Sequence, residues 1–160
     1  MEMIDFERKH GVAILRGLTV TVNSQTYALD ILSELKIGKT IEEVREQLRS
    51  QPQVMAFWSS LYVLAELEVQ QKRSQYGAMR AAIYLRLRNE KENKGKSEPY
   101  MKMEVDSNDE LFQLELSVNR ADYTKKMIGI ARDACSDQFV GLTTMLKNLQ
   151  EQENAVRRIA

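Results

Sequence analysis

The chain has 160 residues, enough for one ordinary domain or two small lobes. With 43% apolar and 29% charged residues, its composition is typical of globular proteins and excludes wholesale disorder. The 23 basic and 23 acidic side chains cancel, so net charge gives no argument for a nucleic-acid partner, and a lone cysteine, Cys135, excludes an intramolecular disulfide.

The N-terminal residues carry no positively charged region followed by an apolar stretch, so we expect no signal peptide. Residues 54–69 are the most apolar stretch, but they include Glu66 and Glu68 and fall short of the ~18–20 apolar residues that span a membrane. The lone cysteine fits a reducing compartment. We therefore expect a cytoplasmic protein with no membrane partner.

Residues 1–50 are predicted to form an N-terminal extension with one or more short strands and two short helices. Residues 11–22 are rich in β-branched side chains and alternate in polarity, which predicts a short strand or a β-hairpin arm. Asn23-Ser24 is typical of a helix N-cap. Apolar residues then follow at helical spacing up to a stop at Gly38, namely Ala28, Ile31, Leu32 and Leu35.

The second short helix is predicted to begin at Thr40. Thr40 and Glu43 have the spacing of a capping box, in which each side chain accepts a hydrogen bond from the other's backbone N–H. Pro52 lacks an N–H donor and disfavours helix at the preceding residue, so we expect an interruption at residues 50–52. One long helix is predicted from Gln53 to about Asn89 and becomes basic beyond Val69.

Residues 51–160 are predicted to form a second domain, which is helical. Residues 90–99 are charged and lack periodicity, which predicts a loop. Residues 100–105 are predicted to be either a short extended segment or an N-terminal extension of the following helix. Ser107 and Glu110 have capping-box spacing and predict the start of the last helix.

Apolar residues recur along this last helix at steps of three and four, so it could continue for about 45 residues. The shorter helix over residues 53–89 cannot cover a stripe of that length. We therefore predict a mainly α protein whose long amphipathic helices form a helical hairpin that associates into a homo-oligomer. The contacts between chains are assigned to Leu114, Val118, Ile128, Phe139, Leu142, Leu146 and Leu149.

Sequence signatures of catalysis are absent. The chain has one histidine, His10, and its cysteine lies on the apolar stripe, so neither a Cys–His catalytic pair nor a zinc site is indicated. Residues 94–97 (KGKS) lack the first glycine and the strand–loop–helix context of a phosphate-binding loop. We expect no catalytic residue, metal or cofactor.

One basic band is hidden by the neutral total. Residues 72–103 hold nine basic and three acidic side chains, a net charge of +6, between flanks of −3 each. Cations neutralise phosphates and tyrosine rings stack on unpaired bases, which favours a single-stranded nucleic-acid partner. The candidate DNA-binding residues are Lys72, Arg73, Tyr76, Arg80, Tyr84, Arg86, Arg88, Lys91, Lys94, Lys96 and Lys102.

Two other interpretations of this band are open. Lysine and arginine at a helix C-terminus also complement the helix dipole and keep a polar face solvated. Tyr84 and Leu85 are equally consistent with the core of a helical hairpin.

The order of features over residues 53–155 resembles the UvsY family of phage recombination mediators. A helix that becomes basic (KRSQYGAMRAAIYLRLR) precedes a charged loop, the segment KSEPYMKMEVDSNDEL, and a long helix with a central cysteine and a late stripe of Leu142, Leu146 and Leu149. The first ~50 residues have no counterpart. Of the family's two positive residues spaced two apart, Arg80 matches the first and Ala82 takes the place of the second. The nearest such pair is Arg86 and Arg88.

The resemblance implies a ring-shaped protein that binds single-stranded DNA, with residues 51–160 as the oligomerisation and DNA-binding domain. If the chain is phage-encoded, the expected location is the host cytoplasm. The resemblance also implies two protein partners, a RecA-like recombinase and the single-strand binding protein that the recombinase replaces on DNA. The alternative function is a non-enzymatic coiled-coil protein with a structural, scaffolding or chaperone-like role in phage assembly. The stripe on the last helix fits both functions, whereas the basic band favours the first.

Overall fold

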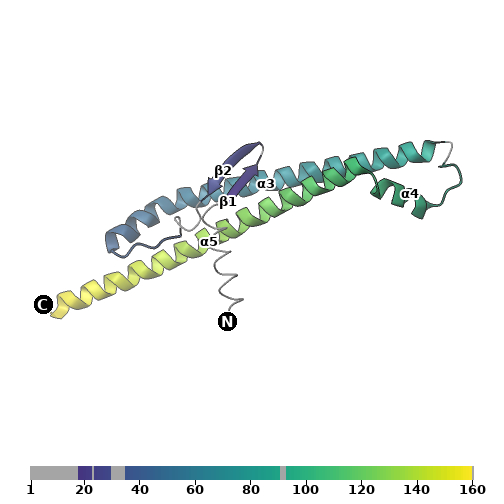
Figure 1. Ribbon diagram of the computed structural model, residues 1–160. Coiled ribbons are helices and arrows are strands. Elements are labelled where there is room, and N and C mark those ends of the chain that lie inside the picture. Colours follow the sequence, from purple (N-terminus) through teal and green to yellow (C-terminus); the bar gives the residue numbers. More distant parts are fainter. Residues whose placement is uncertain (1–17, 23, 30–34, 91–92, 160) are drawn as a thin grey trace, which may run out of the picture. The chain divides into compact units, whose positions relative to one another are not determined.

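The computed structural model describes residues 18–22, 24–29, 35–90 and 93–159. Within these residues, strands β1 (Leu18–Val22) and β2 (Gln25–Leu29) precede helices α3 (Ile41–Asn89), α4 (Glu98–Asp106) and α5 (Asp109–Ile159) (Figure 1). This arrangement confirms the prediction of a mainly helical protein with a small β-structure near its N-terminus. No helix in the described part is both long enough and apolar enough to cross a membrane.

The chain divides into two compact units. Unit 1 combines Met1–Val63 with Met127–Ala160, and unit 2 is Leu64–Lys126. Each unit therefore contains one stretch of α3 and one stretch of α5. The boundary predicted near residue 50 falls inside α3, because this helix is continuous there.

The β-hairpin belongs to unit 1. Its strands are antiparallel, with Val20 opposite Tyr27, and Ser24 in the connecting turn has a φ of 65°, the left-handed region that tight hairpin turns use. Val20 and Val22 are buried while Thr19 and Thr21 are exposed, as the alternating sequence predicts.

The helix predicted from Asn23-Ser24 onward is wrong where the structure describes it, because Ala28 lies in β2. The pairing of β2 with β1 decides its conformation, and the ring of Tyr27 also packs edge-on against Phe57 at 6.3 Å between centroids. Neither contact is visible in local spacing. Asn23, Ile31 and Leu32 lie outside the described residues.

The capping box at the start of α3 is confirmed. The Glu43 N–H donates to Thr40 Oγ1 at 3.2 Å, and the Thr40 N–H donates to Glu43 Oε2 at 3.1 Å. The Lys39 N–H donates to the same carboxylate oxygen at 2.7 Å. These backbone hydrogen bonds, together with the charge of Lys39, lower the pKa of the Glu43 carboxyl below its ordinary value.

The predicted interruption at residues 50–52 is wrong, because α3 runs through Pro52 as one helix of 49 residues. Pro52 is exposed, whereas its neighbour Gln51 is buried and donates from Nε2 to the Cys135 carbonyl at 2.8 Å. This contact with α5 holds the helix across the position where proline removes a backbone hydrogen bond. The long partner that results covers more of α5 than the sequence indicated.

The core of unit 1 is a seam between antiparallel stretches of α3 and α5. On α3, buried residues recur every seven positions at Val44, Gln51 and Trp58, and on α5 the same spacing places Ile128, Cys135 and Leu142 inside. Seven-residue spacing is typical of helices that pack as a coiled coil. The lone cysteine is therefore a core residue.

The core of unit 2 includes α4. Ile83, Val105 and Leu111 form a buried cluster, against which Tyr76, Met79, Tyr84 and Leu87 pack. Of the two structures predicted for residues 100–105, the extended segment is wrong. The helical alternative is right about their conformation, but they belong to a separate helix, α4, in which Met101 and Val105, four residues apart, bury one face.

The capping box predicted at Ser107 is also wrong. The Ser107 N–H bonds to the Met103 carbonyl, so Ser107 ends α4. Asn108 caps α5 instead, accepting from the Leu111 N–H at 3.1 Å.

Candidate nucleic-acid interface

The described candidate DNA-binding residues all lie in unit 2, and Lys91 lies outside the described residues. Lys94 and Lys96 are in the connection between α3 and α4, Lys102 is on α4, and the rest are on α3. The turn at residues 93–97 is fixed to the end of α3, because Asn93 Nδ2 donates to the Leu87 carbonyl at 3.0 Å. Gly95 has a φ of +88°, a conformation that favours glycine.

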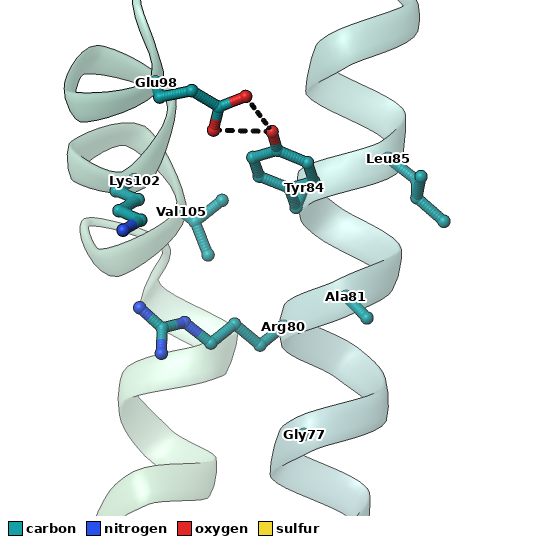
Figure 2. A pocket seen from close by; sticks show the side chains of 8 residues that line it. All are labelled: Gly77, Arg80, Ala81, Tyr84, Leu85, Glu98, Lys102 and Val105. Atoms are coloured by element: carbon teal, nitrogen blue, oxygen red, sulfur yellow. Dashed lines mark hydrogen bonds between the residues drawn. The ribbon is translucent and has the colours of Figure 1, made fainter.

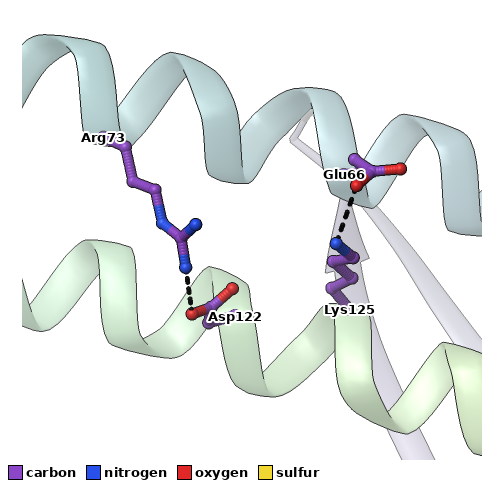
Figure 3. A network of polar contacts seen from close by, with 4 residues as sticks. All are labelled: Glu66, Arg73, Asp122 and Lys125. Carbon is purple, nitrogen blue, oxygen red and sulfur yellow. Dashed lines mark hydrogen bonds and ion pairs between the residues drawn. The ribbon is translucent and has the colours of Figure 1, made fainter.

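The cations in the earlier part of the band are paired with acids. Lys72 pairs with Glu68 on the same helix at 3.3 Å, and Arg73 Nη2 reaches Asp122 on α5 at 2.6 Å (Figure 3). Arg80 Nη2 contacts Asp106 at the end of α4 at 2.9 Å. These charges are therefore at least partly neutralised within the chain.

A second pair in Figure 3, Lys125 with Glu66 at 2.8 Å, also links α3 and α5 in unit 2. Unit 2 as a whole holds 12 basic and 11 acidic residues, a net charge of +1. In the folded chain, acidic residues from the segment after residue 103 therefore contact the basic band. Linear charge counting cannot detect this compensation.

Four exposed basic side chains gather near the connection between α3 and α4. Arg88, Lys94, Lys96 and Lys102 are exposed there, and we call these four residues the basic tip. Among the described residues, Lys94 and Lys102 form no ion pair, and Lys96 donates from Nζ to the Tyr100 hydroxyl at 2.9 Å. Arg88 lies 3.7 Å from a Glu98 oxygen, a loose and exposed contact that leaves its guanidinium accessible.

Arg86 is exposed but lies apart from the basic tip. It lines a hollow shared with Glu104, Asp109 and Glu110, so acids of α4 and α5 dominate its surroundings. Arg86 and Arg88, although two residues apart, therefore face different environments.

The tyrosines have structural contacts of their own. Tyr76 and Tyr84 pack against the unit 2 core, and Lys96 Nζ lies 4.2 Å from the centroid of the Tyr100 ring. Tyr84 also donates its hydroxyl hydrogen bond to Glu98, with 2.7 Å to each carboxylate oxygen. This hydrogen bond, with burial and the Glu98 charge, raises the pKa of the Tyr84 phenol.

Glu98 is a site residue that the sequence did not single out. Together with Tyr84 it lines two hollows of unit 2, one bordered by Arg88, Lys94 and Lys96 and the other by Arg80 and Lys102. The sequence feature that could have identified Glu98 is its position before Pro99, because an acidic residue and a proline are both typical of the first turn of a helix.

The candidate oligomerisation residues have unequal exposure. Ile128 and Leu142 are fully buried within unit 1, and Phe139 is 44% exposed. Leu114, Val118, Leu146 and Leu149 are partly exposed. Large apolar side chains outside the predicted set are more open to solvent, and they include Val63, Leu67, Ile130 and Val140.

No three His, Cys, Asp or Glu side chains in the described ranges are grouped to hold a metal ion. His10 lies outside these ranges. No protein-family model, curated protein sequence or solved structure matches the chain.

Proposed function

We propose that this chain is a non-enzymatic helical protein that binds single-stranded DNA at the basic tip of unit 2. The observation that supports this most is the contrast within the band: Lys94 and Lys102 have no acidic partner among the described residues, whereas Arg73 and Arg80 are paired. Exposed lysines beside tyrosine rings suit a partner with phosphates and unpaired bases.

The finer role that we propose is recombination mediation, as the UvsY-like order of sequence features implies. In this role a homo-oligomer, ring-shaped in the proposal, presents many basic tips to one strand. It helps a RecA-like recombinase replace the single-strand binding protein. A single tip with few cations binds weakly, and repetition around an oligomer raises the overall affinity through effective concentration.

The test is a titration of a fluorescent single-stranded oligonucleotide at several salt concentrations. Each phosphate contact contributes about 0.7 to the slope of log affinity against log salt. The double variant Lys94→Ala, Lys102→Ala should therefore lower the slope by about 1.4 and weaken binding. Arg80 is unsuitable for this test because its removal also breaks the contact with Asp106.

The matched control is Lys126→Ala, Lys147→Ala, which removes the same charge from exposed positions outside the basic tip. This control should keep the wild-type slope. Equal slopes for the tip variant and the control, or no binding by the wild type at low salt, would contradict the proposal.

The second candidate function is a coiled-coil structural, scaffolding or chaperone-like role in assembly. Exposed apolar side chains favour it, since Val63 and Val140 are each 63% exposed and Ile130 is 57% exposed. If this role is correct, the double variant Lys94→Ala, Lys102→Ala should still support assembly. Substitutions of the exposed apolar residues should abolish assembly.

A further inference from the structure

A cleft of about 610 Å³ lies between α3 and α4 in unit 2. Its size falls within the range of roughly 300–1,000 Å³ that is typical of small-ligand sites. Figure 2 shows that Tyr84 and Glu98 lie at one end, joined by their hydrogen bonds, and that Arg80 and Lys102 lie further along. One cleft therefore combines an aromatic ring, an acceptor carboxylate and two cations.

Part of the α3 side of this cleft is open, because two of its lining residues are small. Gly77 and Ala81 line it, and a Cβ added at Gly77 would have no heavy atom within 4 Å. Leu85, one turn beyond Ala81, is 59% exposed. Gly77, Ala81 and Leu85 thus form an apolar strip on the α3 side of the cleft, against which a flat apolar group could lie.

The polar groups of the cleft indicate which class of ligand could bind there. Both Glu98 oxygens accept from Tyr84, but an ionised carboxylate has about four acceptor positions and can accept further hydrogen bonds. An exocyclic amino group of a base is a suitable donor. Lys102 has no ion pair within the described residues and could contact an adjacent phosphate.

An acidic peptide could pair with the cations of the cleft, but it lacks a flat face that also carries amino donors. A nucleobase instead offers a flat apolar face together with amino donors. The basic tip borders the same Tyr84–Glu98 pair, so a strand crossing the tip passes beside the cleft.

We propose that the cleft between α3 and α4 receives one unstacked base of a single strand whose backbone crosses the basic tip. This inference rests on the single-stranded DNA binding proposed above. It adds that the strand is held by a base as well as by its phosphates, which gives the interface a component that salt does not screen.

The experiment compares a deoxycytidine oligonucleotide with an abasic strand of the same length and phosphate number. The wild-type protein should bind the cytidine strand at least about fivefold more tightly, because the base removes apolar surface of the cleft and of its own face from water. The variant Ala81→Leu fills the cleft with a good helix former and changes no charge. It should remove this preference while leaving affinity for the abasic strand unchanged.

The matched control is Ala82→Leu, an exposed position on the same helix outside the cleft, which should keep the wild-type preference. Equal affinity of the wild type for the two strands would overturn the base site and leave phosphate binding standing. An equal loss for both strands in Ala81→Leu would overturn it too.

The solution mass of both variants is measured in parallel. A change in mass in Ala81→Leu alone would assign the cleft to a second copy of the chain and overturn the base site. Failure of the wild type to bind either strand at low salt contradicts the proposed function itself, so the two failures are distinguishable.

Discussion

Two glutamines lie in the seam between α3 and α5 in unit 1. Gln51 Nε2 donates to the Cys135 carbonyl at 2.8 Å and lies 3.3 Å from Gln138 Oε1. Gln138 Nε2 donates in turn to the Lys36 carbonyl at 3.1 Å. A buried polar contact of this kind can fix the register of two helices, since a shifted alignment would leave its amides without partners.

We expect Gln51→Leu to lower the free energy of unfolding by about 1–3 kcal/mol, because acceptors on α5 lose their buried donor. Chemical denaturation followed by circular dichroism measures this change. Gln53→Leu, at an exposed position on the same helix, serves as the control and should be nearly neutral. A loss of similar size in the control would show that the effect does not depend on the buried contact.

Glu43 makes stability dependent on pH. Hydrogen bonds from the Lys39 and Thr40 backbone lower its pKa from the ordinary value of 4.5. A group whose pKa is lower in the folded state contributes stability above its unfolded pKa and loses it as the pH falls through the folded pKa. As the pH falls from neutral to below the ordinary pKa of 4.5, the wild type should therefore lose more free energy of unfolding than Glu43→Gln.

Denaturation midpoints measured over a series of acidic pH values test this expectation. Glu42→Gln is the control, because it removes a neighbouring carboxylate of the same helix turn to which no described backbone N–H donates. Glu42→Gln should keep the acid dependence of the wild type. If Glu43→Gln also keeps it, the assignment of the acid dependence to Glu43 is wrong.

At the scale of elements, two helical glycines differ in their surroundings. A Cβ at Gly77 on α3 would meet nothing within 4 Å, whereas a Cβ at Gly129 on α5 would lie 3.3 Å from Tyr62 Cε2. Glycine inside a helix costs about 0.5–1 kcal/mol relative to alanine. Gly77→Ala should therefore raise the free energy of unfolding by that amount, and Gly129→Ala should raise it less or lower it.

Thermal and chemical unfolding of the two variants provide the comparison, and each variant is the other's control. A destabilised Gly77→Ala would mean that the backbone there makes a close contact with another molecule. An equal gain in both variants would contradict the contact between Gly129 and Tyr62.

Elements determined by local contacts were predictable from the sequence. The capping box needs only Thr40 and Glu43, three residues apart, and its geometry matches. The strand β2 was not predictable in this way, because its spacing also suits a helix and its pairing with β1 decides the outcome. Pro52 misled for a related reason, since the buried contact of Gln51 with a residue 84 positions away sustains the helix.

In the candidate site, too, features set by neighbouring residues were predictable and long-range contacts were not. Sequence placed Lys94 and Lys102 in one basic segment, which the structure also shows. It could not show that Arg73 and Arg80 are paired with acids 49 and 26 residues further along the chain. Nor could it reveal the Tyr84–Glu98 pair, because this contact depends on α4 folding back beside α3.

At the scale of the whole molecule, exposed apolar residues lead us to expect association. Ile130 and Val140 lie on α5 in unit 1 with more than half of their surface open to solvent. Light scattering should therefore give a mass that is a multiple of 18.5 kDa. The double variant Ile130→Glu, Val140→Glu should lower that mass, because burying two carboxylates in an interface is costly.

Ser136→Glu adds a charge at an exposed polar position on the same helix and should leave the mass unchanged. A monomeric wild type would contradict association, and would also remove the multivalency that the proposed DNA binding at the basic tip requires.

The single tryptophan and the single cysteine of this protein are both in the seam of unit 1, and neither Trp58 nor Cys135 has any exposed surface. Tryptophan fluorescence and reaction with a thiol reagent would therefore both report on the opening of unit 1. Neither signal would report on unit 2, where the basic tip lies. Loosening of the tip would be silent to both probes, so its dynamics require a cysteine introduced there or hydrogen exchange resolved by residue.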